Sequence, residues 1–233
     1  MQWWIYIIIY IVSQIAGGLI GIFLPLPIIG SVLLAHLLAI VLVLILRPKK
    51  VERPADWRYK GMMALLMAPP LIVLVNLIQE WLPTLPSFID EQSLSVLMHH
   101  PLGILSIALL APISEELTFR AGILGSLSEG RSPWRAVLLS ALIFAVAHMN
   151  PVQMPVAFVM GLLLGWAYWQ TGSLLVPCLI HIMNNSLAVG LGLIYADPDI
   201  SFTEVLGGSL GTGIALAVSA AWLLAVVYRL SKA

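Results

Sequence analysis

The chain has 233 residues, of which 61% are hydrophobic and only 9% are charged. Soluble domains carry about 25% charged residues because polar groups must cover their surface, so this composition excludes a soluble protein and predicts an integral membrane protein. Eleven basic residues balance eleven acidic residues, and the zero net charge gives no reason to expect a nucleic-acid partner. The single cysteine, Cys178, excludes an intrachain disulfide and a cysteine-based zinc site.

Eight apolar segments are candidates for membrane spans. Crossing the ~30 Å hydrocarbon core takes about 20 helical residues, and a helix satisfies its own backbone hydrogen bonds in lipid. The candidates are residues 3–23, 29–46, 61–79, 101–127, 134–150, 154–170, 174–195 and 209–229. We therefore predict an all-α polytopic membrane protein of about eight transmembrane helices that form one domain over residues 1–233. The first segment is too long for a signal peptide and lacks a basic start, so we expect it to be retained.

Two of these spans contain residues that disturb a regular helix. A proline removes a backbone donor and clashes with the preceding turn. Pro69-Pro70 therefore predicts a kink in the third span, and Pro112 followed by Glu115-Glu116 predicts an interruption of the fourth.

The basic residues predict the orientation in the membrane. Six of them lie between the second and third spans: Arg47, Lys49, Lys50, Arg53, Arg58 and Lys60. Because cytoplasmic loops carry an excess of Lys and Arg, that loop should be cytoplasmic. Counting spans from there places both termini in the cytoplasm, together with Arg131, Arg135, Arg229 and Lys232. The opposite loops carry Asp90, Glu91, Asp197, Asp199 and Glu204, and no Lys or Arg.

Three spans contain ionisable or amide side chains at membrane depth, where each charge costs about 2.5–3.5 kcal/mol on insertion scales. They are Glu115, Glu116 and Arg120 in the fourth span, His148 in the fifth, and His181, Asn184 and Asn185 in the seventh. Such groups need partners, a water-filled cavity or a function. At a rise of 1.5 Å per residue, Glu115 and His148 both lie about 25 Å from the turn near residue 131, so they can meet.

The acidic pair of the fourth span divides into two roles. Glu116 and Arg120 are four residues apart with the acid first, which is the favourable order for an ion pair. We expect a bidentate contact between them, and a purely structural ion pair is an equally good interpretation. Glu115 faces another direction without an assigned cation, so it is free to act as a general acid or base.

The histidines show the same four-residue spacing. Phe144 lies four residues before His148, so its ring can pack beneath the imidazole. His181 and Asn185 repeat the spacing and direct two hydrogen-bonding groups to one point. His36 is alone on an apolar helix, and we expect it to hydrogen-bond a neighbour.

These residues form three motifs that resemble those of the CAAX-protease and bacteriocin-processing family. Glu115-Glu116-x-x-x-Arg120 resembles its E-E-x-x-x-R motif, Phe144-x-x-x-His148 its F-x-x-x-H motif, and His181-x-x-x-Asn185 its H-x-x-x-N motif. The resemblance covers about residues 100–190, which would form the catalytic core. Each motif alone is weakly specific, whereas three in order on consecutive helices are specific.

The resemblance implies a membrane peptidase whose polar intramembrane cavity opens toward the cytoplasm. Family members include the eukaryotic type II CAAX prenyl endopeptidase, which removes a C-terminal tripeptide from prenylated proteins. Prokaryotic members are linked to bacteriocin maturation and self-immunity. We therefore expect a membrane-associated peptide or protein as the substrate, and the lipid bilayer of a prokaryotic cell membrane as the location.

The resemblance also assigns a role to each motif residue. Glu115 and His148 would activate a water molecule for attack on a peptide carbonyl. Glu116, Arg120 and Phe144 would orient that arrangement. His181 and Asn185 would donate hydrogen bonds to the tetrahedral oxyanion, where two preorganised donors contribute several kcal/mol.

A metal ion and two other functions are the alternatives. Glu115, His148 and His181 could bind zinc in principle, but the spacing is not the H-E-x-x-H of zinc peptidases, so we expect no metal cofactor. A proton-coupled transporter could use the same residues as a relay, although the sequence shows no repeated broken helices. A non-catalytic immunity or scaffold protein could keep the fold, although every motif position is filled.

Overall fold

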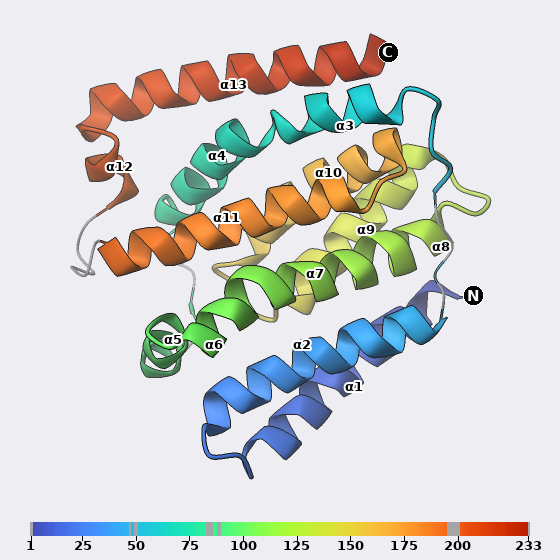
Figure 1. The fold of residues 1–233 in the computed structure, drawn as a ribbon. Helices are drawn as coiled ribbons and strands as arrows, with labels where there is room; N and C mark the ends of the chain where they lie inside the picture. The colour runs from blue at the N-terminus through green and yellow to red at the C-terminus, as the bar shows by residue number, and fades with distance from the viewer. Residues whose placement is uncertain are drawn as a thin grey trace.

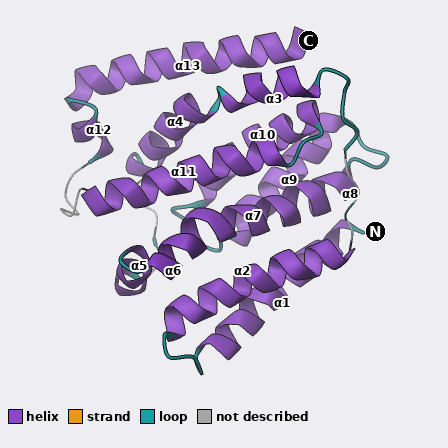
Figure 2. Ribbon diagram, viewed as in Figure 1, coloured by secondary structure: helices purple, strands orange, loops and turns teal. Residues whose placement is uncertain are grey.

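The computed structural model describes residues 2–46, 48, 51–82, 86–87, 90–194 and 201–232. Every regular element within these ranges is a helix (Figure 1, Figure 2), which confirms the all-α prediction. Five charged residues used to predict the orientation lie outside the described residues: Arg47, Lys49, Lys50, Asp197 and Asp199.

Each of the eight predicted spans corresponds to helical structure. The helices are α1 (Trp3–Gly21), α2 (Pro27–Leu46), α3 with α4 (Trp57–Leu65, Ala68–Glu80), the continuous helix from α6 to α8 (Pro101–Leu127), α9 (Pro133–Ala147), α10 (Met154–Thr171), α11 (Leu175–Ile194) and α13 (Gly208–Lys232). By length and composition five of these described helices could cross a membrane, or six if α3 and α4 form one bent span. A polytopic membrane protein is confirmed. The number eight stays a prediction, because α9 has only 15 residues and α10 is not among the five.

The predicted kink in the third span is confirmed. α3 and α4 meet at an angle of 42°, and Pro69-Pro70 lies in the first turn of α4. Neither proline has an N–H to donate to the last turn of α3, so the helix restarts in a new direction.

The fourth span is continuous, so its predicted interruption is wrong. Two π-helical stretches, η1 (Ser106–Leu110) and η2 (Glu116–Leu124), join α6 (Pro101–Leu105), α7 (Ala111–Glu115) and α8 (Gly125–Leu127). Pro112 has no N–H, and the helix accommodates it by widening: Ala111 N–H is donated five residues back, to the Ser106 carbonyl. In lipid, a wider turn is favoured over a break because broken backbone hydrogen bonds would stay unpaired.

The helices alternate in direction, which gives the bundle two ends (Figure 1). The basic end holds both termini, the connection before α3, the turn after α8 and the turn between α10 and α11. The far end holds the α1–α2 turn, α5 (Glu91–Met98), the α9–α10 connection and α12 (Phe202–Val205). The described basic residues other than Arg120 all belong to the basic end: Arg53, Arg58, Lys60, Arg131, Arg135, Arg229 and Lys232.

α5 is a short helix at the far end that the sequence did not predict. Its cap is Asp90, whose carboxylate accepts the Ser93 N–H at 2.9 Å. Hydrogen bonds from the Ser93 hydroxyl and N–H lower the pKa of the Asp90 carboxyl. α5 packs closely on α6 because Gly103 has no side chain: a Cβ there would lie 2.2 Å from the Leu97 carbonyl oxygen.

The half of the bundle nearer the basic end is filled by apolar side chains. Its members include six side chains that are at most 2% exposed: Ile123, Leu124, Leu127, Val137, Leu164 and Tyr168. They come from η2, α8, α9 and α10, within about three helical turns of the basic-end connections. This core closes the bundle on that side.

Glycines pack α1 closely against α2 and against the fourth span. A Cβ on Gly17 would lie 2.4 Å from the backbone nitrogen of Ala35, and one on Gly122 would lie 2.5 Å from the Tyr6 ring. Contacts this close require glycine at both positions. The N-terminal hairpin is therefore held beside η2, where its side chains can reach the site.

Candidate active site

Five of the seven predicted site residues line one cavity of about 440 Å³ between α7, α9 and α11. They are Glu115, Phe144, His148, His181 and Asn185. The other two, Glu116 and Arg120, lie fully buried at 0% exposure and contact members of this group. The three motifs therefore meet in space, as the spacing along the helices predicts.

Glu116 connects two of the motifs. Its Oε1 lies 2.8 Å from His181 Nδ1, and its Oε2 lies 2.9 Å from Arg120 Nε. The predicted bidentate contact with Arg120 is wrong, because the second carboxylate oxygen is taken by the imidazole from α11. Arg120 Nε approaches the carboxylate as an ion pair, outside the direction of an N–H···O hydrogen bond.

The Arg120 guanidinium also packs on an aromatic ring. Its Cζ lies 4.4 Å from the ring centroid of Phe144, which in turn contacts Phe119 at 5.0 Å. Arg120 Nη1 and Nη2 make no hydrogen bond with any described residue. The ring face therefore contributes a cation–π attraction where further hydrogen bonds are missing.

His148 is held in one tautomer. It caps the C-terminal end of α9, and its Nδ1 lies 2.9 Å from the Phe144 carbonyl oxygen. A carbonyl oxygen only accepts, so Nδ1–H donates and the neutral imidazole carries its lone pair on Nε2. The predicted ring contact is present: Phe144 meets the imidazole edge-on at 4.7 Å. The imidazole is thereby fixed as a proton acceptor.

His181 faces both acids of the fourth span. Its Nδ1 bonds Glu116, and its Nε2 lies 3.8 Å from Glu115 Oε2. An ionised carboxylate only accepts, so Nδ1 carries a proton. If Nε2 also carries one, the cations of His181 and Arg120 balance the two carboxylates. A buried cluster with no net charge avoids the large cost of an uncompensated charge.

Asn185 satisfies a carbonyl that the π-helix leaves free. Its Nδ2 donates to the Ile107 carbonyl oxygen at 3.0 Å, and its Oδ1 accepts from Asn184 Nδ2 at 3.2 Å. In an α-helix the Ile107 carbonyl would pair with Ala111 N–H, but that group is donated one residue further back. The following residue, Pro112, cannot donate to the Ile107 carbonyl instead, because it has no N–H. Each amide nitrogen has two hydrogens, so Asn185 keeps one for a ligand.

Sequence analysis missed contacts from the N-terminal hairpin. Tyr10 of α1 makes a side-chain hydrogen bond with Glu115, and its ring packs on Phe119 at 5.3 Å. His36 of α2 forms a hydrogen bond through Nδ1 with Ser114 Oγ at 2.8 Å, which confirms the expected hydrogen bond to a neighbour. A lone polar side chain in an apolar span is the only signal that could have suggested His36. Nothing in the sequence distinguishes Tyr10.

Whether the site could bind a metal ion depends on how its acids and imidazoles are arranged. Within the described ranges no three His, Cys, Asp or Glu side chains are arranged to hold one metal ion. His181 Nδ1 is engaged by Glu116, and His148 Nδ1 by a backbone carbonyl. The site therefore presents hydrogen-bonded acids and bases, and cofactor use is a question for experiment.

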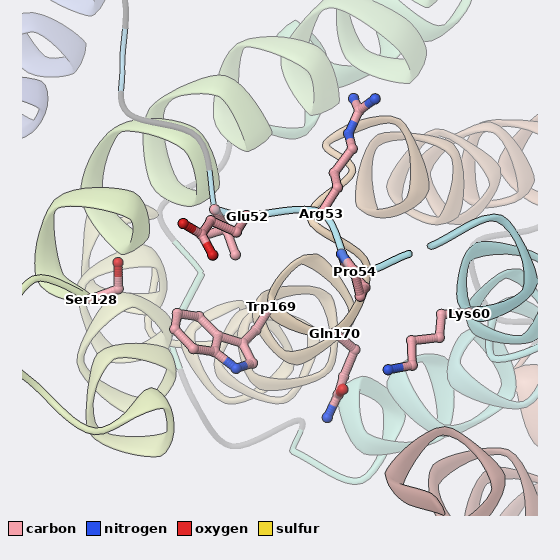
Figure 3. A pocket seen from close by; sticks show the side chains of 8 residues that line it. Glu52, Arg53, Pro54, Lys60, Ser128, Trp169 and Gln170 are labelled. Atoms are coloured by element: carbon pink, nitrogen blue, oxygen red, sulfur yellow. The ribbon is translucent and has the colours of Figure 1, made fainter. Parts of the chain in front are cut away.

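A second hollow, of about 510 Å³, lies at the basic end (Figure 3). It is lined by Val51, Glu52, Arg53, Pro54, Lys60, Ser128, Trp169 and Gln170. Arg53 Nε donates to the Gly172 carbonyl oxygen at 3.2 Å, and Lys60 lies 3.4 Å from Asp56. Because this hollow contains none of the motif residues, we assign the candidate active site to the other cavity.

The site cavity extends toward the far end. Leu94 and Met98 of α5 and Gln153, the cap of α10, belong to its lining. Toward the basic end, the apolar core closes the bundle. The sequence predicts both a cytoplasmic basic end and, from the resemblance, a cavity open to the cytoplasm. These two expectations cannot both be right, because the cavity and the basic residues are at opposite ends.

The spans of this membrane protein thus gather two carboxylates, two imidazoles and an amide around a polar cavity. Comparison with known families points to the same residues. Residues 97–187 match the family described as type II CAAX prenyl endopeptidase Rce1-like, and all seven predicted site residues fall within this segment. The segment therefore matches the Rce1-like CAAX protease family, which confirms the resemblance.

Three curated bacterial proteins are similar in sequence. The membrane-embedded CAAX protease MroQ of Staphylococcus aureus is 32% identical over 148 residues, which cover 61% of this chain and 59% of MroQ. YdiL of Bacillus subtilis is 32% identical over 96 residues, which cover 41% and 39%. An uncharacterized 24.3 kDa protein of Escherichia coli is 34% identical over 97 residues, which cover 39% and 44%. No solved structure matches the chain. The matched segment is thus less than two thirds of each relative.

Proposed function

We propose that this chain is an intramembrane peptidase that hydrolyses a peptide bond of a membrane-associated peptide or protein, with a water molecule activated by Glu115 and His148. The observation that carries the proposal is that both side chains line one cavity with His181 and Asn185. The family of residues 97–187 supports the peptidase class. CAAX-type and bacteriocin-related peptides are the candidate substrates.

Water activation would use the two acceptors that face the cavity. Glu115 keeps 12% of its side chain exposed there, and His148 presents Nε2 because its Nδ1 is held by the Phe144 carbonyl. A water between them can lose a proton to one acceptor as its oxygen attacks the carbonyl carbon. The proton can then pass to the leaving amine, and such acid–base catalysis contributes about 10²–10⁴-fold.

Oxyanion stabilisation would use His181 and Asn185. As an imidazolium, His181 presents Nε2–H while Nδ1–H stays on Glu116. Asn185 offers the amide hydrogen that Ile107 does not use. Glu116, Arg120 and Phe144 act as positioning residues, since each contacts a neighbour of the reacting atoms through the ion pair and ring contacts described above.

We further propose that the reaction needs no metal ion. Glu115, His148 and His181 are the residues that would have to hold zinc, and His181 is already bonded through Nδ1 to an acid of its own cluster. Dialysis of the purified protein against a strong chelator should leave peptide cleavage unchanged. Activity that is lost and returns only with Zn²⁺ would overturn this part of the proposal.

The location proposed is a prokaryotic cell membrane, with the basic end and both termini in the cytoplasm. This orientation rests on the positive-inside bias, since no described basic residue except Arg120 lies elsewhere. The bilayer is then the medium in which substrate and enzyme meet.

Cleavage of peptides by the purified chain tests the function. The protein in detergent is incubated with a mixture of fluorescence-quenched peptides, and products are identified by mass spectrometry. We expect cleavage by the wild type and none by Glu115→Ala or His148→Ala, with expression near wild type. Glu91→Ala and His99→Ala are matched controls, because both residues are on or beside α5 and outside the cavity lining.

The same protein distinguishes the alternatives. Reconstituted in proteoliposomes, a proton-coupled transporter would show solute uptake driven by a pH gradient and no cleavage. A non-catalytic immunity or scaffold protein would show neither activity. An inactive Glu115→Ala variant isolated from cells with its bound membrane partner would identify the natural substrate by mass spectrometry.

A further inference from the structure

We infer that the active-site cavity opens on the extracytoplasmic side of the membrane, so that the chain cleaves uncharged peptide segments presented from outside the cytoplasm. The inference about substrate rests on the proposed peptidase function, whereas the inference about orientation stands on the fold. Three independent observations carry it: the cavity lining, the closed core and the distribution of basic residues.

The lining places the opening at the far end. Leu94 and Met98 come from α5, Gln79 from the last turn of α4, and Gln153 from the cap of α10. All of these elements or helix ends belong to the far end (Figure 1). Within the site, His148 caps the far-end terminus of α9 and is partly exposed.

The core excludes an approach from the basic end. Leu124 and Leu164 are 0% exposed, Val137 is 1% and Tyr168 is 2%. These side chains come from three helices that surround the site, and they fill the bundle between Arg120 and the basic-end turns. Protein interiors packed in this way contain few voids larger than a water molecule. A peptide therefore has no path to Glu115 through this half of the bundle.

The basic residues fix which end is cytoplasmic. Of the eleven Lys and Arg residues, seven lie at the basic end among the described residues, three more follow the last residue of α2 in the sequence, and the eleventh is the buried Arg120. Lys and Arg near span ends set the orientation of membrane proteins far more strongly than acidic residues do. The far end, and with it the cavity mouth, should accordingly face away from the cytoplasm.

The position of the catalytic pair along its helices agrees with an opening at the far end. Glu115 and His148 lie about 25 Å along their helices from the turn near residue 131, out of a hydrocarbon thickness of ~30 Å. The catalytic pair is therefore farther from the turn at the basic end than from the opposite limit of the hydrocarbon core.

The lining also indicates the chemistry of the segment that enters. Among the described lining residues, Glu115 is the only acid and there is no Lys or Arg; the rest beyond the histidines are amides and apolar side chains. The His181 imidazolium is already paired with Glu116, so it cannot also neutralise an acidic substrate residue, and burying an unpaired charge is costly. An uncharged segment, with amide partners in Gln79, Gln153 and Asn184, fits this surface.

Cysteine labelling tests the orientation without any need for catalysis. Cys178, which is buried, is replaced by alanine, and single cysteines are introduced as Ser95→Cys on α5 and Ser132→Cys in the turn before α9. Both serines are exposed, and Ser132 makes no side-chain cap bond. We expect a membrane-impermeant maleimide to label Ser95→Cys in intact spheroplasts and Ser132→Cys only after lysis. The reverse pattern, or equal labelling of both in intact spheroplasts, would overturn the inference.

An activity assay on oriented vesicles tests the side of the membrane from which the substrate enters. Membrane-impermeant quenched peptides are added to right-side-out or to inverted vesicles that contain the full chain, with Glu115→Ala as the blank. We expect cleavage about tenfold or more faster with right-side-out vesicles, because charged tags keep the peptides from crossing, and equal rates after detergent. Faster cleavage by inverted vesicles overturns the inference. Absence of cleavage in detergent defeats the proposed function instead, and the labelling result then decides the orientation alone.

Discussion

Asn185 on α11 donates a hydrogen bond from Nδ2 to the Ile107 carbonyl oxygen in η1, at 3.0 Å. The carbonyl is available because Ala111 N–H is donated to Ser106 instead, and the next residue, Pro112, has no N–H to donate. The π-helical turn of the fourth span therefore leaves a carbonyl free, and this carbonyl holds the Asn185 amide of the seventh span beside the catalytic pair. The proline belongs to the geometry of the site although it touches no substrate.

Asn185→Ala should lower kcat by about 10²–10³-fold, which is the loss measured when one oxyanion donor is removed, and should change KM little. The matched control is Asn76→Ala, because Asn76 donates within its own helix to the Ile72 carbonyl and lies outside the cavity lining. Steady-state kinetics on peptide cleavage provide the measurement. A rise in KM at unchanged kcat would mean that Asn185 binds the ground state and does not stabilise the oxyanion.

Pro112→Ala should lower kcat by a smaller factor than Asn185→Ala, because the new N–H competes with Asn185 for the Ile107 carbonyl. In a double variant the proline substitution should add almost nothing, since residues that act through one contact are not additive. Pro101→Ala is the control, because that proline occupies the first turn of α6, away from the cavity. Independent, additive losses in the double variant would contradict the proposed coupling.

The sequence was sufficient to predict the helical segments and the residues that meet at the candidate site. Long apolar runs leave little alternative to helices in lipid, and a four-residue spacing places Phe144 beside His148 whatever the surrounding structure. The same reasoning found the charged cluster, because ionisable groups in a span are rare. These are local consequences of helix geometry, and local rules suffice for them.

Contacts between helices were beyond sequence reasoning. Tyr10 reaches Glu115 because Gly122 lets the N-terminal hairpin approach η2, and no spacing rule relates residues a hundred positions apart. The bidentate contact with Arg120 failed because His181, from another helix, takes the second oxygen of Glu116. The side on which the cavity opens likewise depends on which half of the bundle the core fills.

Tyr10→Phe should lower kcat by about tenfold or more and leave KM near the wild-type value. A hydrogen bond to a charged group contributes roughly 1.5–3 kcal/mol, and about 1.4 kcal/mol corresponds to a tenfold change in rate. The substitution keeps the ring that packs on Phe119, so stability should hold. Tyr6→Phe is the control. Tyr6 is in the same helix as Tyr10, but it is buried against Gly122 of η2. Equal effects of the two substitutions would show that Tyr10 acts only through packing.

Glu116→Gln and Arg120→Met should each destabilise the protein by about 3–5 kcal/mol, because each leaves one buried charge without its partner. Both residues are 0% exposed, and Arg120 Nε lies 2.9 Å from Glu116 Oε2. The double variant should lose less stability than the sum of the single ones, since it removes both charges together. Thermal unfolding in detergent measures the effect.

Asp56→Asn is the matched control for that pair. It breaks the contact between Asp56 and Lys60, which lies at the basic end with 37% of the Asp56 side chain exposed, and pairs near solvent typically contribute about 0.2–1 kcal/mol. Its unfolding temperature should therefore stay close to that of the wild type. If Glu116→Gln unfolded no earlier than Asp56→Asn, Glu116 would have to be uncharged in the native protein. The neutral four-residue cluster with His181 as its second cation would then be wrong.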